Sequence, residues 1–165
     1  MSLETKCQSI RMILSDVDGV LTDGTIEIDH LGNESKRFST LDGYGIRLWK
    51  RAGYEFGLVT GRSSPCVLHR AKDLGIDIVR LGTFEKREAV LEIAQQRQLS
   101  LEEIAFIGDD LPDLPAIRAV GLGVTVPDSP EPLRHAADYV TLRRGGYGAV
   151  RDLIDRILGV KEQHK

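Results

Sequence analysis

The sequence is short of the features that mark secreted, membrane-spanning and nucleic-acid-binding proteins. Its only cysteines, Cys7 and Cys66, form no CxxC pair and have no histidine at ligand spacing, so we expect two free thiols in a reducing compartment. No apolar run approaches the length of a membrane span, and residues 1–10 lack the charged start and apolar stretch of a signal peptide. The formal charge of −3 gives no reason to expect nucleic acid or a membrane surface as a partner. These absences favour a cytoplasmic protein.

What the sequence does contain is a regular alternation of short apolar runs and amphipathic segments. The 165 residues, 41% hydrophobic and 28% charged, suit one globular domain spanning 1–165. The alternation predicts an α/β fold of Rossmann-like type, with three layers (α/β/α) and a mostly parallel sheet. We expect strands at 11–15, 55–60, 76–80, 104–108, 122–126 and 138–142, helices at 41–53, 65–74, 85–98, 111–120, 130–136 and 149–158, and a frayed polar tail at 161–165.

A segment of alternating apolar and polar residues follows the first predicted strand. Within residues 24–38, alternation on both sides of Gly32-Asn33 predicts a β-hairpin inserted after that strand. An isolated two-stranded ribbon is only marginally stable in water, so the hairpin should pack against the domain or against another subunit. No insertion is long enough to form a cap domain over the ends of the sheet.

The first predicted strand ends in two carboxylates, Asp16 and Asp18, followed by Gly19. Two aspartates this close remain ionised at low cost only beside a cation, and a hard divalent ion suits their oxygen atoms. The alternative is an acidic turn with Gly19 at its corner.

Further polar residues follow the other predicted strands, and in a parallel sheet the loops at the carboxyl ends of the strands converge on one crevice. The alternatives are an acidic helix cap for Asp109 and Asp110, and surface positions for Arg62 and Lys86. The residues in question are Thr60, Gly61, Arg62, Lys86, Asp109, Asp110 and Asp113.

Such a set of side chains suits phosphoryl transfer. A carboxylate can attack phosphorus to form an acyl-phosphate, and Asp18 can protonate the leaving alkoxide and then take a proton from water. The Thr60 hydroxyl, nearby backbone N–H groups and the Lys86 ammonium can hold the phosphate oxygens. Arg62 offers a second contact to a phosphate or carboxylate of the substrate. Arg143, Gly145 and Gly146 precede the last helix and form either a turn or a further anion-binding loop.

The segments DVDGV, VTGR and GDDLPD, together with Lys86, resemble the ordered motifs of the haloacid dehalogenase superfamily of phosphatases. Within it the sequence is similar to the 3-deoxy-D-manno-octulosonate 8-phosphate (KDO 8-phosphate) phosphatases, through DVDGVLTDG, KRFSTLDGYGIRLWKRAG, VTGR, FIGDDLPD and RRGGYGAVRDLI. The resemblance implies that Asp16 is the nucleophile and Asp18 the acid/base, and that Thr60 and Lys86 hold the phosphate. Mg²⁺ would bind Asp16, the backbone carbonyl of Asp18 and Asp109. We expect Asp110 and Asp113 to lie next to these ligands, where Asp110 contacts metal-bound water or orients Lys86.

The resemblance also implies a reaction and an assembly. The reaction is Mg²⁺-dependent hydrolysis of KDO 8-phosphate through an aspartyl-phosphate, in lipopolysaccharide biosynthesis. Three alternatives remain: a phosphatase for a nine-carbon sugar acid 9-phosphate, a non-catalytic oligomerisation domain related to acylneuraminate cytidylyltransferases, and phosphonate or phosphotransferase chemistry. Members of the family form homotetramers in which the hairpin, here 24–38, builds a barrel and a neighbouring subunit helps to close each site. The sequence departs from the family at Glu85-Lys86, where relatives usually carry Asp-Lys.

Overall fold

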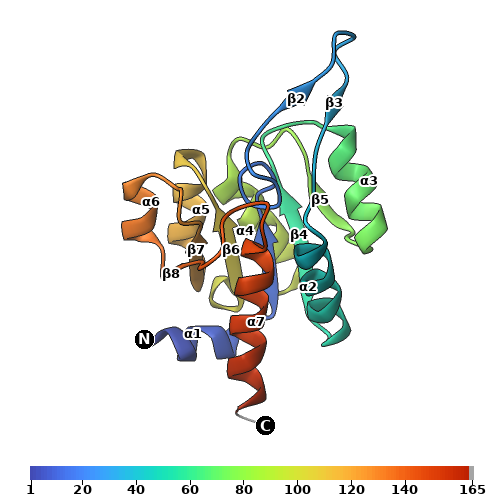
Figure 1. The fold of residues 1–165 in the computed structure, drawn as a ribbon. Helices are drawn as coiled ribbons and strands as arrows, with labels where there is room; N and C mark the ends of the chain where they lie inside the picture. The colour runs from blue at the N-terminus through green and yellow to red at the C-terminus, as the bar shows by residue number, and fades with distance from the viewer. Residues whose placement is uncertain (164–165) are drawn as a thin grey trace.

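A central parallel sheet organises the protein, whose computed structural model describes residues 1–163 (Figure 1). Six strands lie in the order β5-β4-β1-β6-β7-β8, and every neighbouring pair is parallel. This topology confirms the predicted fold class. The strands are β1 (Met12–Ser15), β4 (Glu55–Val59), β5 (Ile78–Arg80), β6 (Ile104–Gly108), β7 (Leu122–Thr125) and β8 (Tyr139–Val140).

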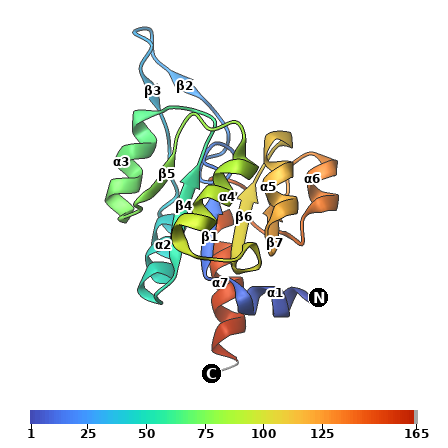
Figure 2. The same cartoon turned by 180° about the vertical axis from the view of Figure 1, so that it is seen from behind.

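Helices cover both faces of the sheet and enclose two hydrophobic clusters (Figures 1 and 2). Because side chains alternate across a strand, Ile13 of β1 joins one cluster, whereas Met12 and Leu14 join the other. No helix in residues 1–163 is both long enough and apolar enough to cross a membrane. The first cluster includes residues of α1 (Leu3–Ser9), α2 (Thr40–Arg51), α3 (Pro65–Leu74) and α7 (Ala149–Glu162), and the second includes residues of α4 (Lys86–Arg97), α5 (Leu114–Ala119) and α6 (Glu131–Ala136).

The predicted hairpin is present and projects from the edge of the domain (Figure 1). Its paired part is shorter than the alternation suggested, because only β2 (Glu27–Ile28) and β3 (Glu34–Ser35) pair, in antiparallel fashion. The Asp29 carboxylate accepts bonds from two backbone N–H groups of the turn, at 2.8 and 2.9 Å, and so replaces strand pairing there. The side chains of Ile26, Ile28 and Leu31 are exposed. Leu31 is the most exposed of the three, with 74% of its surface accessible to solvent.

The two ends of the chain differ from expectation. Helix α1 was not predicted, because its only buried residue is Cys7 and no apolar period marks it. The prediction of a polar tail from Lys161 was wrong, since α7 continues to Glu162 and the Lys161 side chain is buried. Its ammonium donates to the backbone oxygen of Gln8 at 2.6 Å and lies 4.8 Å from the centre of the Tyr54 ring. The last two residues of the predicted tail, 164–165, lie outside the described range.

The segment predicted as one helix at 111–120 is divided. A 3₁₀ turn, η2 (Leu111–Asp113), comes first and α5 follows it directly. Pro112 and Pro115 each occupy the start of one of these two elements, where the missing N–H of proline costs nothing. The division places Asp113 at the junction, beside the carboxyl end of β6.

Candidate active site

A cleft of about 600 Å³ opens at the carboxyl ends of β1, β4 and β6. It brings together the residues that sequence analysis placed after these strands, and adds others from the hairpin and from the loop before α4. Arg143, Gly145 and Gly146 do not line it. The lining residues are Asp16, Asp18, Gly24, Glu34, Thr60, Gly61, Arg62, Ser63, Phe84, Lys86, Asp109, Asp110, Pro112 and Asp113.

A buried ion-pair cluster forms the floor of the cleft. The Lys86 ammonium, at the first residue of α4, lies 2.6 Å from Asp16 Oδ2 and 2.5 Å from Asp113 Oδ1. Burial opposes the charge of Lys86, but the two carboxylates outweigh it and raise the pKa of the lysine. The other oxygen of Asp113 accepts the backbone N–H groups of Asp109 and Asp110, at 2.9 and 3.2 Å. Asp113 therefore orients both Lys86 and the Asp109 loop.

The structure gives Asp110 a different neighbour from the one we expected. Its carboxylate accepts the backbone N–H of Leu111 at 2.7 Å and caps the turn η2. Asp113, not Asp110, pairs with Lys86. A contact between Asp110 and metal-bound water stays a prediction.

Three carboxylates in the cleft fit a divalent cation. Oxygens of Asp16, Asp109 and Asp113 lie within 4.8 Å of one another, and the Lys86 ammonium pairs with Asp16 and Asp113. Burial, reinforced by the charge of Asp113, raises the pKa of Asp16 to about 6. Burial and then the charges of Asp16 and Asp113 raise the pKa of Asp109 to about 7. This excess of negative charge suits a hard cation with oxygen ligands. Asp113 is the most fully engaged of the three carboxylates, because it contacts Lys86 and two backbone N–H groups.

Glycine at position 19 lets the loop that follows β1 approach the loop that follows β6 closely. Its backbone has a φ of +88°, and a Cβ added there would lie 2.0 Å from Asp109 Oδ2. Gly19 therefore does more than form the corner of an acidic turn, because its missing side chain makes room for the Asp109 carboxylate.

Asp18 lies outside the carboxylate cluster and pairs with a residue of the hairpin. Its Oδ1 accepts a hydrogen bond from Lys36, whose ammonium is also 2.7 Å from Glu34 Oε1. Glu34 Oε2 accepts from Arg62 Nη2 at 2.7 Å, and the contacts with Lys36 and Arg62 lower the pKa of Glu34 to about 2. Sequence analysis missed Glu34 and Lys36. Their spacing of two residues is compatible with one face of the hairpin, but it does not indicate that Lys36 reaches Asp18.

The loop after β4 forms another wall of the cleft. Thr60 is buried, and its hydroxyl oxygen accepts the backbone N–H of Arg62 at 3.3 Å. Gly61 faces the ring of Phe84, since a Cβ at Gly61 would lie 3.3 Å from Phe84 Cε1. Phe84 is 73% exposed at the rim of the cleft, and sequence analysis did not single it out.

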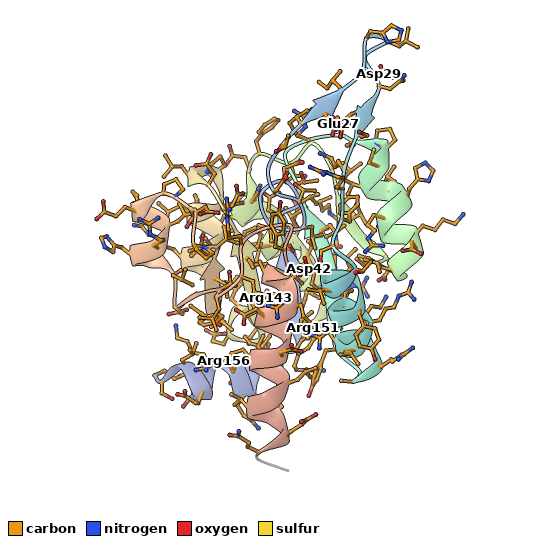
Figure 3. The ribbon with its side chains drawn as sticks, in the orientation of Figure 1. Glu27, Asp29, Asp42, Arg143, Arg151 and Arg156 are labelled. Carbon is orange, nitrogen blue, oxygen red and sulfur yellow. The ribbon has the colours of Figure 1, made fainter. Side chains whose placement is uncertain are left out.

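The loop before α7 packs against the segment that follows β1. A Cβ at Gly145 would lie 1.8 Å from the backbone oxygen of Gly19, and one at Gly146 would lie 2.6 Å from the backbone nitrogen of Asp23. Figure 3 shows Arg143 near the start of α7, close to the point where α7 meets α2. Close packing accounts for both glycines, and the substrate-binding role of Arg143, Gly145 and Gly146 stays a prediction.

Comparisons with known proteins agree with this geometry. A family model described as haloacid dehalogenase-like hydrolase matches residues 75–152. The 3-deoxy-D-manno-octulosonate 8-phosphate phosphatase of Haemophilus influenzae is 39% identical over 156 residues, which are 94% of this chain and 87% of that protein. The structure of its cobalt-bound form has a TM-score of 0.92 at 39% identity and covers 95% of this chain and 92% of that one. The phosphatase of the same name from Moraxella catarrhalis, in complex with magnesium ion, phosphate ion and KDO, has a TM-score of 0.95 at 39% identity and covers 97% and 92% of the two chains. The chain therefore belongs to the haloacid dehalogenase-like hydrolases, within the family of the 3-deoxy-D-manno-octulosonate 8-phosphate phosphatases.

Proposed function

We propose that this protein is a Mg²⁺-dependent phosphatase that hydrolyses KDO 8-phosphate to KDO and phosphate. The observation that carries the proposal is the cluster in which the carboxylates of Asp16 and Asp109 and the ammonium of Lys86 meet in one cleft. The similarity to a relative whose structure contains magnesium, phosphate and KDO supports the substrate and the metal.

Asp16 is the proposed nucleophile. Its Oδ1 accepts the backbone N–H of Val17 at 2.7 Å and its Oδ2 pairs with Lys86, so the carboxylate is held in one orientation. An oxygen of Asp16 forms a bond to phosphorus while the bond from phosphorus to the sugar oxygen breaks, and Asp18 donates a proton to the departing alkoxide. Water then attacks phosphorus, gives a proton to Asp18 and releases phosphate, which restores the Asp16 carboxylate.

The remaining residues hold the phosphoryl group. Mg²⁺ bound by Asp16, Asp109 and the backbone carbonyl of Asp18 would offset the repulsion between the attacking carboxylate and the phosphate. The Thr60 hydroxyl, the backbone N–H of Gly61 and the Lys86 ammonium are the proposed donors to the phosphate oxygens. Because Asp113 holds Lys86 from the other side, the ammonium is in place before the substrate arrives.

The direct test is Asp16→Asn, which keeps the size of the side chain and removes its charge. We expect phosphate release from KDO 8-phosphate to be lost while the circular dichroism spectrum stays native, and Asp128→Asn, outside the cleft, to keep full activity. Undiminished hydrolysis by Asp16→Asn would end the proposal.

A panel of phosphate esters, assayed across a Mg²⁺ titration, tests the substrate. We expect the highest kcat/KM for KDO 8-phosphate. A preference for a nine-carbon sugar acid 9-phosphate would replace the substrate but keep the mechanism. If none of the esters releases phosphate, the non-catalytic oligomerisation domain would be favoured. The presence of all the motif carboxylates argues against that alternative.

We also propose a homotetramer assembled through the hairpin at 24–38. The exposed side chains of Ile26, Ile28 and Leu31 support it, because a ribbon with two-residue strands needs a partner surface. Leu31→Asp should dissociate the assembly in sedimentation experiments, whereas Leu142→Asp, at an equally exposed leucine, should not. A fully active monomer would contradict the proposal.

We place the enzyme in the cytoplasm, where KDO 8-phosphate hydrolysis would serve lipopolysaccharide biosynthesis. The free thiols of Cys7 and Cys66 support a reducing compartment. Cell fractionation followed by an activity assay tests this location, and activity confined to another fraction would contradict it.

A further inference from the structure

A lysine of the hairpin, Lys36, pairs with two carboxylates that line the cleft. The Lys36 side chain is fully buried, at 0% exposure, although it directly follows the exposed Ser35 of β3. Its ion-pair partners are the carboxylates of Asp18 and Glu34, the latter at 2.7 Å. A buried ammonium is costly unless carboxylates surround it, so this position depends on both of them.

The two oxygens of Asp18 have unequal surroundings. Oδ1 accepts from Lys36, whereas Oδ2 is buried and has no hydrogen-bond partner within residues 1–163. A buried oxygen without a partner carries a free-energy cost, which a group of a bound ligand can relieve. Asp18 lines the cleft, and Oδ2 is its oxygen that has no partner within residues 1–163, so we infer that Oδ2 exchanges the proton with a substrate.

Lys36 is itself held from the opposite side. Glu34 contacts Lys36 through Oε1 and Arg62 through Oε2 at 2.7 Å, and the backbone N–H of Arg62 donates to Thr60 Oγ1 at 3.3 Å. The ammonium therefore connects the hairpin, the loop after β4 and the carboxylate of Asp18. These contacts restrict the motion of the Lys36 ammonium, so it can hold the Asp18 carboxylate in one orientation.

We propose that Lys36 is a positioning residue for the general acid: by holding Asp18 Oδ1, it directs Oδ2 toward the leaving oxygen of the substrate. The inference rests on the proposed function. In the step concerned, the electron pair of the breaking P–O bond stays on the leaving oxygen, which takes the proton from Oδ2. The Asp18 carboxylate that results keeps Lys36 as its partner.

The experiment compares two leaving groups in Lys36→Met, which keeps the length of the side chain without its charge. A sugar alkoxide needs a proton as it departs, whereas p-nitrophenolate departs without one. General acid catalysis contributes about 10²–10⁴-fold, so we expect kcat/KM to fall by about 100-fold for KDO 8-phosphate and by only a few-fold for p-nitrophenyl phosphate. Lys36→Arg should recover much of the loss, and Arg37→Met, at the exposed neighbouring residue, should change neither value.

A second comparison separates positioning from an anchoring role for the hairpin. In an Asp18→Asn background, Lys36→Met should add no further loss with KDO 8-phosphate, because the carboxylate it positions is gone. Equal falls for both esters, an unchanged kcat/KM, or additive losses in the double variant would overturn the inference. If Lys36→Met does not fold, Lys36→Gln replaces it in both comparisons. Wild-type protein that hydrolyses neither ester would instead overturn the proposed function.

Discussion

Removing the carboxylate of Asp109 should stabilise the metal-free protein. Burial and the charges of Asp16 and Asp113 raise the pKa of Asp109 from an ordinary 3.8 to about 7. Between these two values the native state binds a proton that the unfolded chain has released, so this group's contribution to stability falls as the pH rises from about 4 to above 7. The carboxylate that would help to bind the metal thus costs stability when no metal is bound.

The magnitude follows from the shift. About three pKa units at 1.36 kcal/mol each give up to about 4 kcal/mol of destabilisation at pH 8. Asp109→Asn keeps the size of the side chain and cannot ionise, so it should raise the melting temperature in EDTA at pH 8 by up to about 8–16 °C. At pH 4, where the native carboxyl is protonated, the same substitution should change it little.

Thermal unfolding with EDTA and with Mg²⁺, at pH 4 and pH 8, provides the assay. Wild-type protein should gain more from Mg²⁺ at pH 8, because bound protons no longer compete with the cation, while Asp109→Asn should gain little at either pH. Asp73→Asn, on the surface and outside the cleft, is the control and should leave the Mg²⁺ response unchanged. An Asp109→Asn protein that melts below wild type in EDTA at pH 8 would refute the electrostatic reasoning.

Three further substitutions test other parts of the structure. Lys86→Met should abolish phosphate release and lower the free energy of unfolding by about 3–5 kcal/mol, because two buried carboxylates lose the cation that they share. An unchanged midpoint in urea denaturation would contradict this. Gly19→Ala should weaken Mg²⁺ binding in calorimetry, because the new Cβ would meet the Asp109 carboxylate, and an unaltered affinity would be the contrary result. Asp42→Ala should lower the free energy of unfolding by about 1–2 kcal/mol in denaturant, because the buried carboxylate accepts two backbone N–H groups at the start of α7, at 2.8 and 3.2 Å. A variant as stable as wild type would show that these bonds contribute nothing.

The periodic spacing of hydrophobic residues made most of the fold predictable. The helix predicted at 85–98 is present as α4, with Ala89, Val90, Ile93 and Ala94 buried, and every predicted strand of the sheet is present. Prediction from this spacing fails for elements that place few side chains in the core. Helix α1 buries Cys7 alone, and the strand predicted at 138–142 shortens to Tyr139–Val140 because Leu142 faces solvent and Asp138 turns its carboxylate to the backbone N–H of Gly123 at 3.0 Å.

The site was predictable where it depends on strand ends and not where it depends on tertiary contacts. Asp16 and Asp109 follow adjacent parallel strands, so topology alone brings them to one edge. The pairing of Lys86 with Asp113 joins residues far apart in the chain, and no local pattern indicates it. Lys36 reaches Asp18 only because the chain returns from the hairpin past the cleft, a path that alternation within the hairpin cannot reveal.

The contact of the glycine loop before α7 with the loop at residues 19–23 has a consequence for synthesis of the protein. Gly146 donates its backbone N–H to the oxygen of Val20 at 2.9 Å, so the loop before α7 rests on a segment that lies more than 100 residues earlier in the chain. A growing chain acquires Asp16, Asp18 and Asp109 well before Gly145 and Gly146 leave the ribosome. Because a domain folds as a unit once its contacts are complete, the loop that follows β1 gains this support only after Gly146 has left the ribosome.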